Sequence, residues 1–457
     1  MKKIVPASLV CLTFGSFSAS AANIGDFQIN GFLSVAAAWD NVKYLPPGSS
    51  GIPGIIGIEP VYNTNIRKRP SFDHDSNVGV QFSKLLREDI SITTQFLAKA
   101  ENEWDVEAVW AFLKWEPSDQ WQFRAGRVRT DPYMLSDYVD VGYAYPWVRP
   151  PEEVYSQIPS EFSNSTGVDA RFRIMMFNRD LTLTAFYGAA TTHLTFPTGL
   201  PLPIGIDNTI FDEIRLRLRD LWSFNIKFGD EVFSVRAGYE TTRVTLDPNA
   251  GTAMEQLNAF LNAMAPPHPF PDPLFFFNPD GIGLDYVNYF SAYNSRASFM
   301  GVGYQFDWKN VVSMGELVKR KAATPIIANA IGWYVMGGYR VKQFLPHITF
   351  AREKLEDNKV RRFNGFINSL FTNPFIGGSS VPLDTIAQPL INTSPNFDGG
   401  AGSQSSLTLG IRWDIYDGVA IKGEFKHVHP DFLSPGLFDV NPMKTVNIYS
   451  VALDAVM

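Results

Sequence analysis

Alternation of apolar and polar side chains with a period of two is the feature that most constrains this chain. Between Ser405 and Tyr416, Leu407, Leu409, Ile411 and Trp413 are separated by small or polar residues. Successive side chains of an extended strand point to opposite faces. The segment is therefore predicted as a strand with one apolar and one polar face.

The sharpest case is the heptapeptide EIRLRLR from Glu213 to Arg219. Ile214, Leu216 and Leu218 would form an apolar face, while the charged residues between them would form the opposite one. Such a strand suits a wall between lipid and an aqueous lumen. A half-buried strand of a soluble sheet also alternates in this way, so the rest of the chain has to distinguish the two.

Sixteen segments are predicted as strands. They are residues 27–39, 77–86, 90–99, 105–115, 121–129, 167–177, 181–189, 211–228, 232–244, 294–308, 311–320, 330–340, 345–355, 405–416, 419–428 and 446–457.

The connections between these segments alternate in length. Two- or three-residue links with charged, Gly or Asn residues recur, as at Lys309-Asn310 and Asp417-Gly418. Between them lie long links, notably residues 40–76, 130–166, 245–293 and 356–404. Short turns on one side and long loops on the other are typical of a transmembrane, antiparallel, up-and-down β-barrel. A large soluble β-sandwich would not readily place all the long loops on one side.

The N-terminus predicts export. Lys2 and Lys3 precede an apolar run and the tripeptide Ala19-Ser20-Ala21, which is the pattern of a secretory signal peptide covering residues 1–21. Residues 22–457 would then form a single barrel domain. That mature domain has no cysteine, because the only one, Cys11, lies in the signal peptide.

Charge and hydropathy exclude several classes of protein. The net charge of −7 becomes −9 without the two leader lysines, which argues against a nucleic-acid partner. The sequence has no run of about 20 apolar residues free of charge, so a transmembrane helix is not expected. No hydrolase or phosphate-loop motif occurs, and we predict neither an enzyme nor a cofactor. Two histidine clusters, at Asp73-His74-Asp75 and at His427 and His429, have too few ligands to specify a metal site.

The fifth predicted strand ends in RAGRVR at Arg129, and the link after it contains DVGYAYPWVRPPEEVY from Asp140 to Tyr155. Here the chain resembles the general-porin superfamily of Gram-negative bacteria, as a little-characterised porin-like member. The C-terminal strand also resembles the one that the outer-membrane assembly machinery recognises, although it ends in Met457 where Phe is usual.

This resemblance implies an outer-membrane diffusion channel for small hydrophilic solutes, assembled as a homotrimer among outer-membrane lipid and lipopolysaccharide. It also implies that the third long loop, residues 130–166 here, folds into the barrel and sets basic wall residues against acidic loop residues. The constriction candidates are Arg124, Arg127, Arg129, Asp131, Asp137, Asp140, Glu152 and Glu153. Opposed charges across a narrow gap can filter ions, or they can simply fix the loop to the wall, and both interpretations stay open.

Arg127 and Arg129 share the phase of Trp121 and Phe123, so a bulge at Gly126 would be needed to turn them inward. Other predicted lumen-facing bases are Arg171, Arg173, Arg215, Arg217, Arg219, Arg236, Arg412, Lys422 and Lys426. The predicted lumen-facing acids are Asp169, Glu213, Glu240, Asp414, Glu424 and Asp454. The basic excess predicts a weak preference for anions, unless the acidic loops cancel it.

Two other functions remain open. The fifth long link has a helical pattern at Leu257, Leu261 and Met264 followed by Phe275-Phe276-Phe277, which would suit a selective transporter of hydrophobic or aromatic solutes or a helix packed on protein. A structural or adhesive barrel with a blocked lumen is the third hypothesis.

Overall fold

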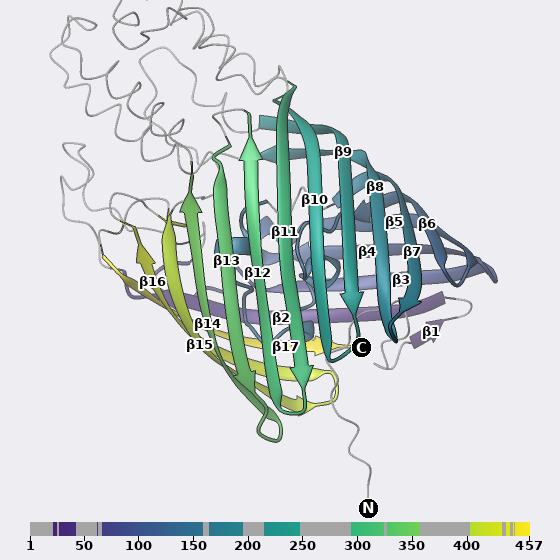
Figure 1. Cartoon of the computed structure of the whole chain (residues 1–457). Coiled ribbons are helices and arrows are strands. Elements are labelled where there is room, and N and C mark those ends of the chain that lie inside the picture. The colour runs from purple at the N-terminus through teal and green to yellow at the C-terminus, as the bar shows by residue number, and fades with distance from the viewer. Residues whose placement is uncertain are drawn as a thin grey trace, which may run out of the picture.

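The computed structural model describes residues 22–24, 27–42, 62, 66–158, 164–194, 214–246, 294–323, 327–356, 403–431, 436–438, 442 and 444–457. The strands of this part of the chain form one antiparallel barrel (Figure 1). Its wall consists of β2 (Phe27–Asp40), β3 (Asn77–Arg87), β4 (Ile90–Lys99), β5 (Val106–Ser118), β6 (Trp121–Arg129), β7 (Asn164–Met176), β8 (Arg179–Leu194), β9 (Ile214–Gly229), β10 (Phe233–Leu246), β11 (Ser295–Trp308), β12 (Val311–Ala322), β13 (Ala330–Tyr339), β14 (Phe344–Leu355), β15 (Gln404–Tyr416), β16 (Val419–Pro430) and β17 (Val446–Val456).

The last strand closes the ring. β17 pairs with β2 from Ile448↔Asp40 to Val456↔Phe32, and the terminal Met457 exchanges backbone hydrogen bonds with Gly31 at 2.9 and 3.1 Å. Among the described residues, each of the sixteen wall strands is therefore paired on both sides, and the wall is closed.

All sixteen predicted segments are strands of this wall, so the predicted all-β antiparallel barrel is confirmed, with ends that differ by a few residues. A short additional strand, β1 (Ala22–Ile24), pairs with β2 and was not predicted. The predicted signal peptide, the helical pattern at 257–264 and Phe275-Phe276-Phe277 lie outside the described residues. None of the helices that the structure describes is long and apolar enough to cross a membrane.

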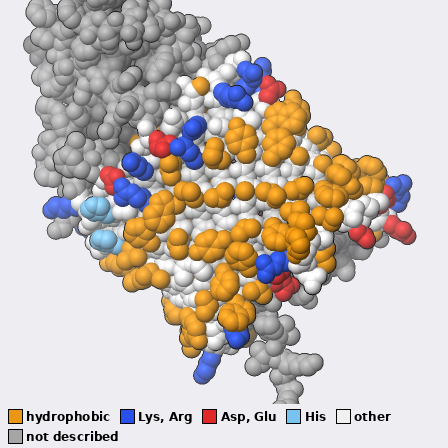
Figure 2. All heavy atoms as spheres, viewed as in Figure 1, with side chains coloured by type: hydrophobic (Ala, Val, Ile, Leu, Met, Phe, Trp, Pro, Cys, Tyr) orange, Lys and Arg blue, Asp and Glu red, His pale blue; other side chains and the backbone are white. Residues whose placement is uncertain are grey.

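The two faces of the wall differ as the alternation predicts. On β15, Leu407, Leu409, Ile411 and Trp413 are exposed on the outer face. The residues between them, such as Thr408, are buried inside. Figure 2 shows the outer apolar side chains as a band across the face in view, with Lys, Arg, Asp and Glu concentrated near its borders. Short turns gather at one end of the barrel, where the C-terminus also lies (Figure 1).

One β-bulge reverses the predicted faces of the upper half of β9. The ladder to β8 passes from Gly188↔Leu221 to Ala190↔Leu218, so β9 has one residue more than its partner at this point. The ladder to β10 shifts at the same place. Asp220 has a φ of 48°, a left-handed conformation that an aspartate tolerates better than most residues. An extra residue turns every following side chain to the other face.

The prediction that Arg217 and Arg219 line the lumen is therefore wrong. Leu216 and Leu218 are buried and pack with Val244 and Ile158 inside the barrel, while Arg219 is exposed. Glu213 lies outside the described residues, and the side chain of Arg215 is not described. The alternation at residues 213–219 is present as predicted, but its apolar face points inward.

Cysteine labelling would test this reversal in the mature chain. We expect Arg219→Cys to react with a membrane-impermeant maleimide on the order of ten times faster than Leu218→Cys, because the first side chain is exposed and the second is buried. Mass spectrometry of folded protein gives both rates. Faster labelling at position 218 would contradict the bulge.

Candidate functional site

The segment from residue 130 to residue 158, between β6 and β7, contacts inner-face side chains of distant strands. We call it the β6–β7 segment. Its indole Trp147 donates from Nε1 to Oγ1 of Thr349 on β14 over 2.8 Å. The backbone N–H of Met134 donates to Glu316 on β12 over 2.9 Å. These contacts span much of the barrel, since β6 and β14 are far apart in the strand order.

Apolar packing attaches this segment to β11 through β14. Tyr133, Leu135, Tyr145, Trp147 and Val154 form one buried cluster with Phe299, Val312, Met314, Val318, Tyr334, Met336, Leu345 and Ala351 of the wall. The Trp147 ring meets that of Tyr334 edge-on, with centroids 5.5 Å apart. Burying one such side chain stabilises the arrangement by roughly 1.5–3 kcal/mol. The inner face here is apolar because the segment covers it.

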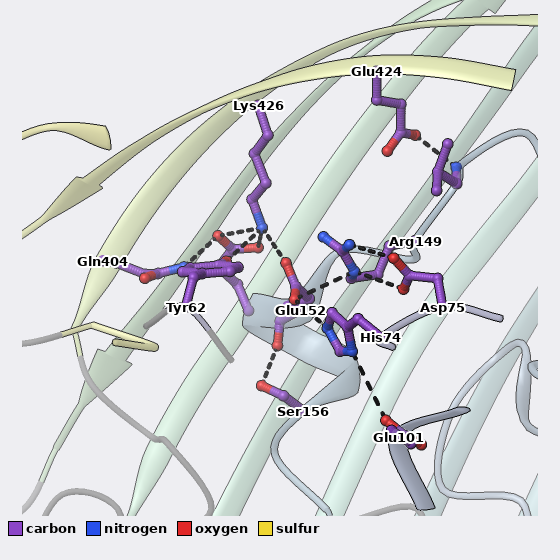
Figure 3. Close-up of polar contacts among 12 residues, drawn as sticks. Tyr62, His74, Asp75, Glu101, Arg149, Glu152, Ser156, Gln404, Glu424 and Lys426 are labelled. Carbon is purple, nitrogen blue, oxygen red and sulfur yellow. Dashed lines mark hydrogen bonds and ion pairs between the residues drawn. The ribbon is translucent and has the colours of Figure 1, made fainter. Parts of the chain in front are cut away.

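Lys426 of β16 is the centre of a buried ionic network at the short helix α1 (Glu152–Tyr155) (Figure 3). Its ammonium lies 2.8 Å from Oε2 of Glu152 and 3.2 Å from Oε1 of Glu153. It also donates to the Tyr62 hydroxyl over 2.9 Å. Gln404 of β15 donates to Oε1 of Glu153 over 2.7 Å. These wall contacts hold the two adjacent carboxylates.

A second cation, Arg149, extends the network toward the first long loop (Figure 3). Its guanidinium donates to both carboxylate oxygens of Asp75, over 2.9 and 2.5 Å, and lies 3.7 Å from Glu152. His74 lies 3.9 Å from Glu152 and 3.8 Å from Glu101. The residues Asp73-His74-Asp75, which the sequence marked as a possible cluster, thus include two members of this network. In the described part of the chain, no group of three or more His, Cys, Asp or Glu side chains is arranged so that it could hold a metal ion.

The network sets the charge state of the Glu152 carboxylate. Burial alone would raise the pKa of Glu152, but the Lys426 ammonium and the Arg149 guanidinium outweigh burial and hold that pKa well below its usual range. Burial would lower the pKa of His74, and the Asp75 carboxylate outweighs that effect and raises it. The network therefore keeps Glu152 ionised through the physiological pH range.

Two further wall cations bind the segment through its backbone. Lys422 donates to the carbonyl oxygens of Gly142 and Trp147 over 2.6 and 2.7 Å, and it pairs with Asp454 at 2.8 Å. Arg412 donates to the Tyr143 carbonyl over 2.6 Å. These predicted wall residues, like Lys426, have the contacts expected of groups that fix the loop.

A different arrangement occurs where the segment begins. Asp131 and Asp137 both face Arg171 of β7, with oxygen-to-nitrogen distances of 3.9 and 4.0 Å. The exposed fraction of the Asp137 side chain is 32%. Burial, with the nearby Asp137 charge, raises the pKa of Asp131 to about 7. Burial also acts on Asp137, but Arg171 and Arg124 outweigh it and lower its pKa.

The remaining cations near this acidic pair have other partners. Arg124 is buried and donates to Asp169 over 2.8 Å, so that its charge is balanced on the wall itself. Arg236 donates to the backbone carbonyls of Asp131 and Pro132. Those acceptors are neutral, and the Arg236 charge acts on the buried acids Glu240 and Glu316 as well as on Asp131.

Arg129 and Asp140 form a third contact. Arg129 is buried and pairs with Asp140, which also lies 3.3 Å from the Lys99 ammonium. Burial would raise the pKa of Asp140, but Arg129 and Lys99 hold it well below its usual range. Each of the five predicted loop acids thus meets a predicted wall base: Asp140 meets Arg129, Glu152 and Glu153 meet Lys426, and Asp131 and Asp137 meet Arg171.

The prediction for Arg127 is wrong. The ladders to β5 and β7 run through Gly126 without a register shift, so the bulge needed to turn Arg127 inward is not there. The next residue, Val128, is the one whose side chain lies on the inner face, where it is fully buried. Arg127 instead pairs with the exposed Glu107 of β5.

The other predicted wall residues fall as follows. Arg173 is half-buried, in the same phase of β7 as the buried Asp169 and Arg171. Glu240 is buried, and Asp414 is half-buried and pairs with Arg412 at 2.8 Å. Glu424 accepts from the backbone N–H of Val148 over 2.9 Å.

Sequence reasoning missed several inner polar residues. They include the half-buried Lys99 and the buried Glu316, Arg320, His347, Glu353 and Gln404. On β12 and β14 the inner phase also contains Met314, Val318 and Ala351, so both faces look apolar in the sequence. The signal that could have revealed the inner face is the isolated charge of Glu316 among apolar neighbours.

Comparisons with known proteins concern the fold. No protein-family model matches the sequence, and no curated protein matches it. The structure resembles the anion-selective porin from Comamonas acidovorans with a TM-score of 0.50 and 7% identity, over 94% of this chain and 99% of that one. It also resembles Salmonella typhi OmpF in complex with daunomycin, with a TM-score of 0.48 and 11% identity over 94% and 97% of the two chains.

The first of these similarities concerns the fold alone: this chain has the closed antiparallel barrel of that porin, here with an apolar outer band and a charged interior. The predicted resemblance is therefore confirmed at the level of the fold.

Removing the central cation should destabilise the protein. We expect Lys426→Met to lower the free energy of unfolding by about 3 kcal/mol, because Glu152 and Glu153 would be left buried without their shared partner. Urea unfolding in detergent micelles measures the change. The matched control Lys309→Met, at an exposed turn, should change it by less than about 0.5 kcal/mol. Equal effects would contradict a special role of the network.

Proposed function

We propose that this chain is an outer-membrane channel through which small hydrophilic solutes diffuse passively, with a weak preference for anions. The observation that carries the proposal is the pair Asp131 and Asp137 facing Arg171 at 3.9 and 4.0 Å inside a closed barrel. Opposed charges at such a distance create a transverse field in a narrow aqueous gap.

In this proposal the barrel is the mature domain of residues 22–457, exported by a signal peptide of residues 1–21 and inserted in the membrane by the outer-membrane assembly machinery. The apolar band on the outer face supports contact with lipid (Figure 2). We further propose that the β6–β7 segment is the inward-folded third loop and sets the bore. Its contacts with Lys422, Lys426 and Thr349 support this role. A homotrimer is proposed from the porin-like fold.

The balance of charge supports the anion preference. The Glu152 and Glu153 carboxylates share Lys426, and Asp140 is shared by Arg129 and Lys99. These pairs are buried and therefore contribute little to an ion path. The cations that lie near Asp131 and Asp137 are Arg171, Arg236 and the half-buried Arg173. These three wall cations favour anions, while the buried acids Glu240 and Glu316, which act on Arg236, oppose them.

Ion selectivity tests the assignment of Arg171. We expect Arg171→Gln to shift the reversal potential in a salt gradient toward cation selectivity, because it removes the cation that faces both carboxylates. Planar-bilayer recording with the refolded protein measures the shift. The matched control is Arg219→Gln, which removes an exposed arginine that the bulge places on the outer face and should leave selectivity unchanged. The reverse result, a shift for Arg219→Gln alone, would overturn the assignment.

Selectivity should also depend on pH. A carboxyl group with a pKa of about 7, as at Asp131, is ionised at pH 8 and protonated at pH 5.5. The interior thus loses one negative charge as the pH falls, and the anion preference should increase. Reversal potentials at the two pH values measure the change. Asp131→Asn should show the same increased preference at pH 8 and a flatter pH dependence. A variant that keeps the wild-type pH dependence would contradict this assignment.

A further inference from the structure

Three arginines lie in a row across neighbouring strands on the outer face. Arg243 of β10 is the register partner of Arg219 on β9 and also of Arg296 on β11. Side chains of register partners project from the same face of a sheet. All three residues are exposed. We call Arg219, Arg243 and Arg296 the arginine row.

The row lies where the outer apolar band ends. On β9, Trp222 follows Arg219 after the bulge and is exposed, and its ring lies 4.5 Å from that of Tyr187 on β8. On β11, Met300 of the same phase is also exposed. Aromatic side chains of this kind mark the level at which acyl chains meet headgroups. Figure 2 shows Lys and Arg side chains above the apolar band at this border.

Without a bound anion, the arginine row should destabilise the strand pairing. Like charges directly opposite each other on neighbouring strands repel. In the described part of the chain, the acid that pairs with the row is Asp220, 3.5 Å from Arg243. Among the described residues, this one carboxylate accompanies three guanidinium groups.

Two other basic residues at this border each have an acidic partner. Lys319 pairs with Glu356 at 2.6 Å, and Arg352 pairs with Asp431 at 2.9 Å. Both pairs contain one acid for each base. The arginine row differs, and the bulge at Asp220 creates the difference, because it turns Arg219 outward beside Arg243. A regular β9 would have placed Arg219 in the lumen.

We propose that the arginine row binds the phosphate of a phosphorylated lipid headgroup in the outer leaflet, with the acyl chains lying over Trp222, Tyr187 and Met300. Guanidinium groups bind phosphate through paired hydrogen bonds. Basic side chains at the membrane surface attract anionic headgroups. The long-loop end of an outer-membrane barrel faces the exterior, where lipopolysaccharide supplies such phosphates. This inference requires membrane insertion but not conduction.

Binding of purified lipopolysaccharide to the refolded full mature chain in detergent tests the proposal. Native mass spectrometry gives the affinity for the lipid and for its dephosphorylated form. We expect wild type to bind the phosphorylated form at least about tenfold more tightly, and the variant R219Q/R243Q/R296Q to lose that difference. The control R87Q/R179Q/K309Q removes three exposed charges at the short-turn end and should bind as wild type.

Two readouts keep the test specific. Heat-modifiable migration on gels confirms that each variant is folded, and single-channel conductance should be the same in all of them, because the row lies outside the lumen. The proposal is overturned if the row variant binds as wild type, if dephosphorylated lipid binds equally well, or if equimolar inorganic phosphate displaces the lipid. Loss of oligomers without loss of lipid would instead assign the row to a second copy of this chain and also overturn it.

Discussion

Closure of the backbone hydrogen-bond ring is the constraint on which the rest of this structure depends. Hydrocarbon offers no partner for a strand edge, so a sheet that faces lipid must pair its last strand with its first. Here β17 pairs with β2, and Met457 bonds to Gly31. Once the ring is closed, each side chain belongs either to the apolar outer band or to the interior, and the interior must satisfy its own polar groups.

The interior meets that requirement through the β6–β7 segment. Its apolar side chains cover Met314, Tyr334 and Met336, and its carboxylates and carbonyls receive Lys422 and Lys426. Most ionic contacts of the segment are buried pairs, which hold it in place. Asp131 and Asp137 differ because they face Arg171 at longer distances and Asp137 stays partly exposed. We therefore propose that fixing the loop and filtering ions, the two interpretations that the sequence left open, belong to different residues of this segment.

Sequence alone predicted all sixteen wall strands, because period-two alternation and short turns are local signals. It failed where one residue changes the phase. Asp220 has no distinctive sequence context, yet its left-handed backbone turns Leu218 inward and Arg219 outward. The opposite error occurred at Gly126, where a bulge was needed for Arg127 and the ladder is regular. The contacts of Tyr62 and His74 with Lys426 and Glu152 join segments far apart in the chain, and no local pattern predicts them.

The central claim is that the charged interior is an open path for ions, and single-channel recording of the refolded protein in a planar bilayer tests it most directly. The proposal predicts stepwise conductance increments of porin size that scale with the salt concentration. A correctly folded barrel, shown by heat-modifiable migration, that inserts without any conductance steps would contradict it and favour a barrel with a blocked lumen.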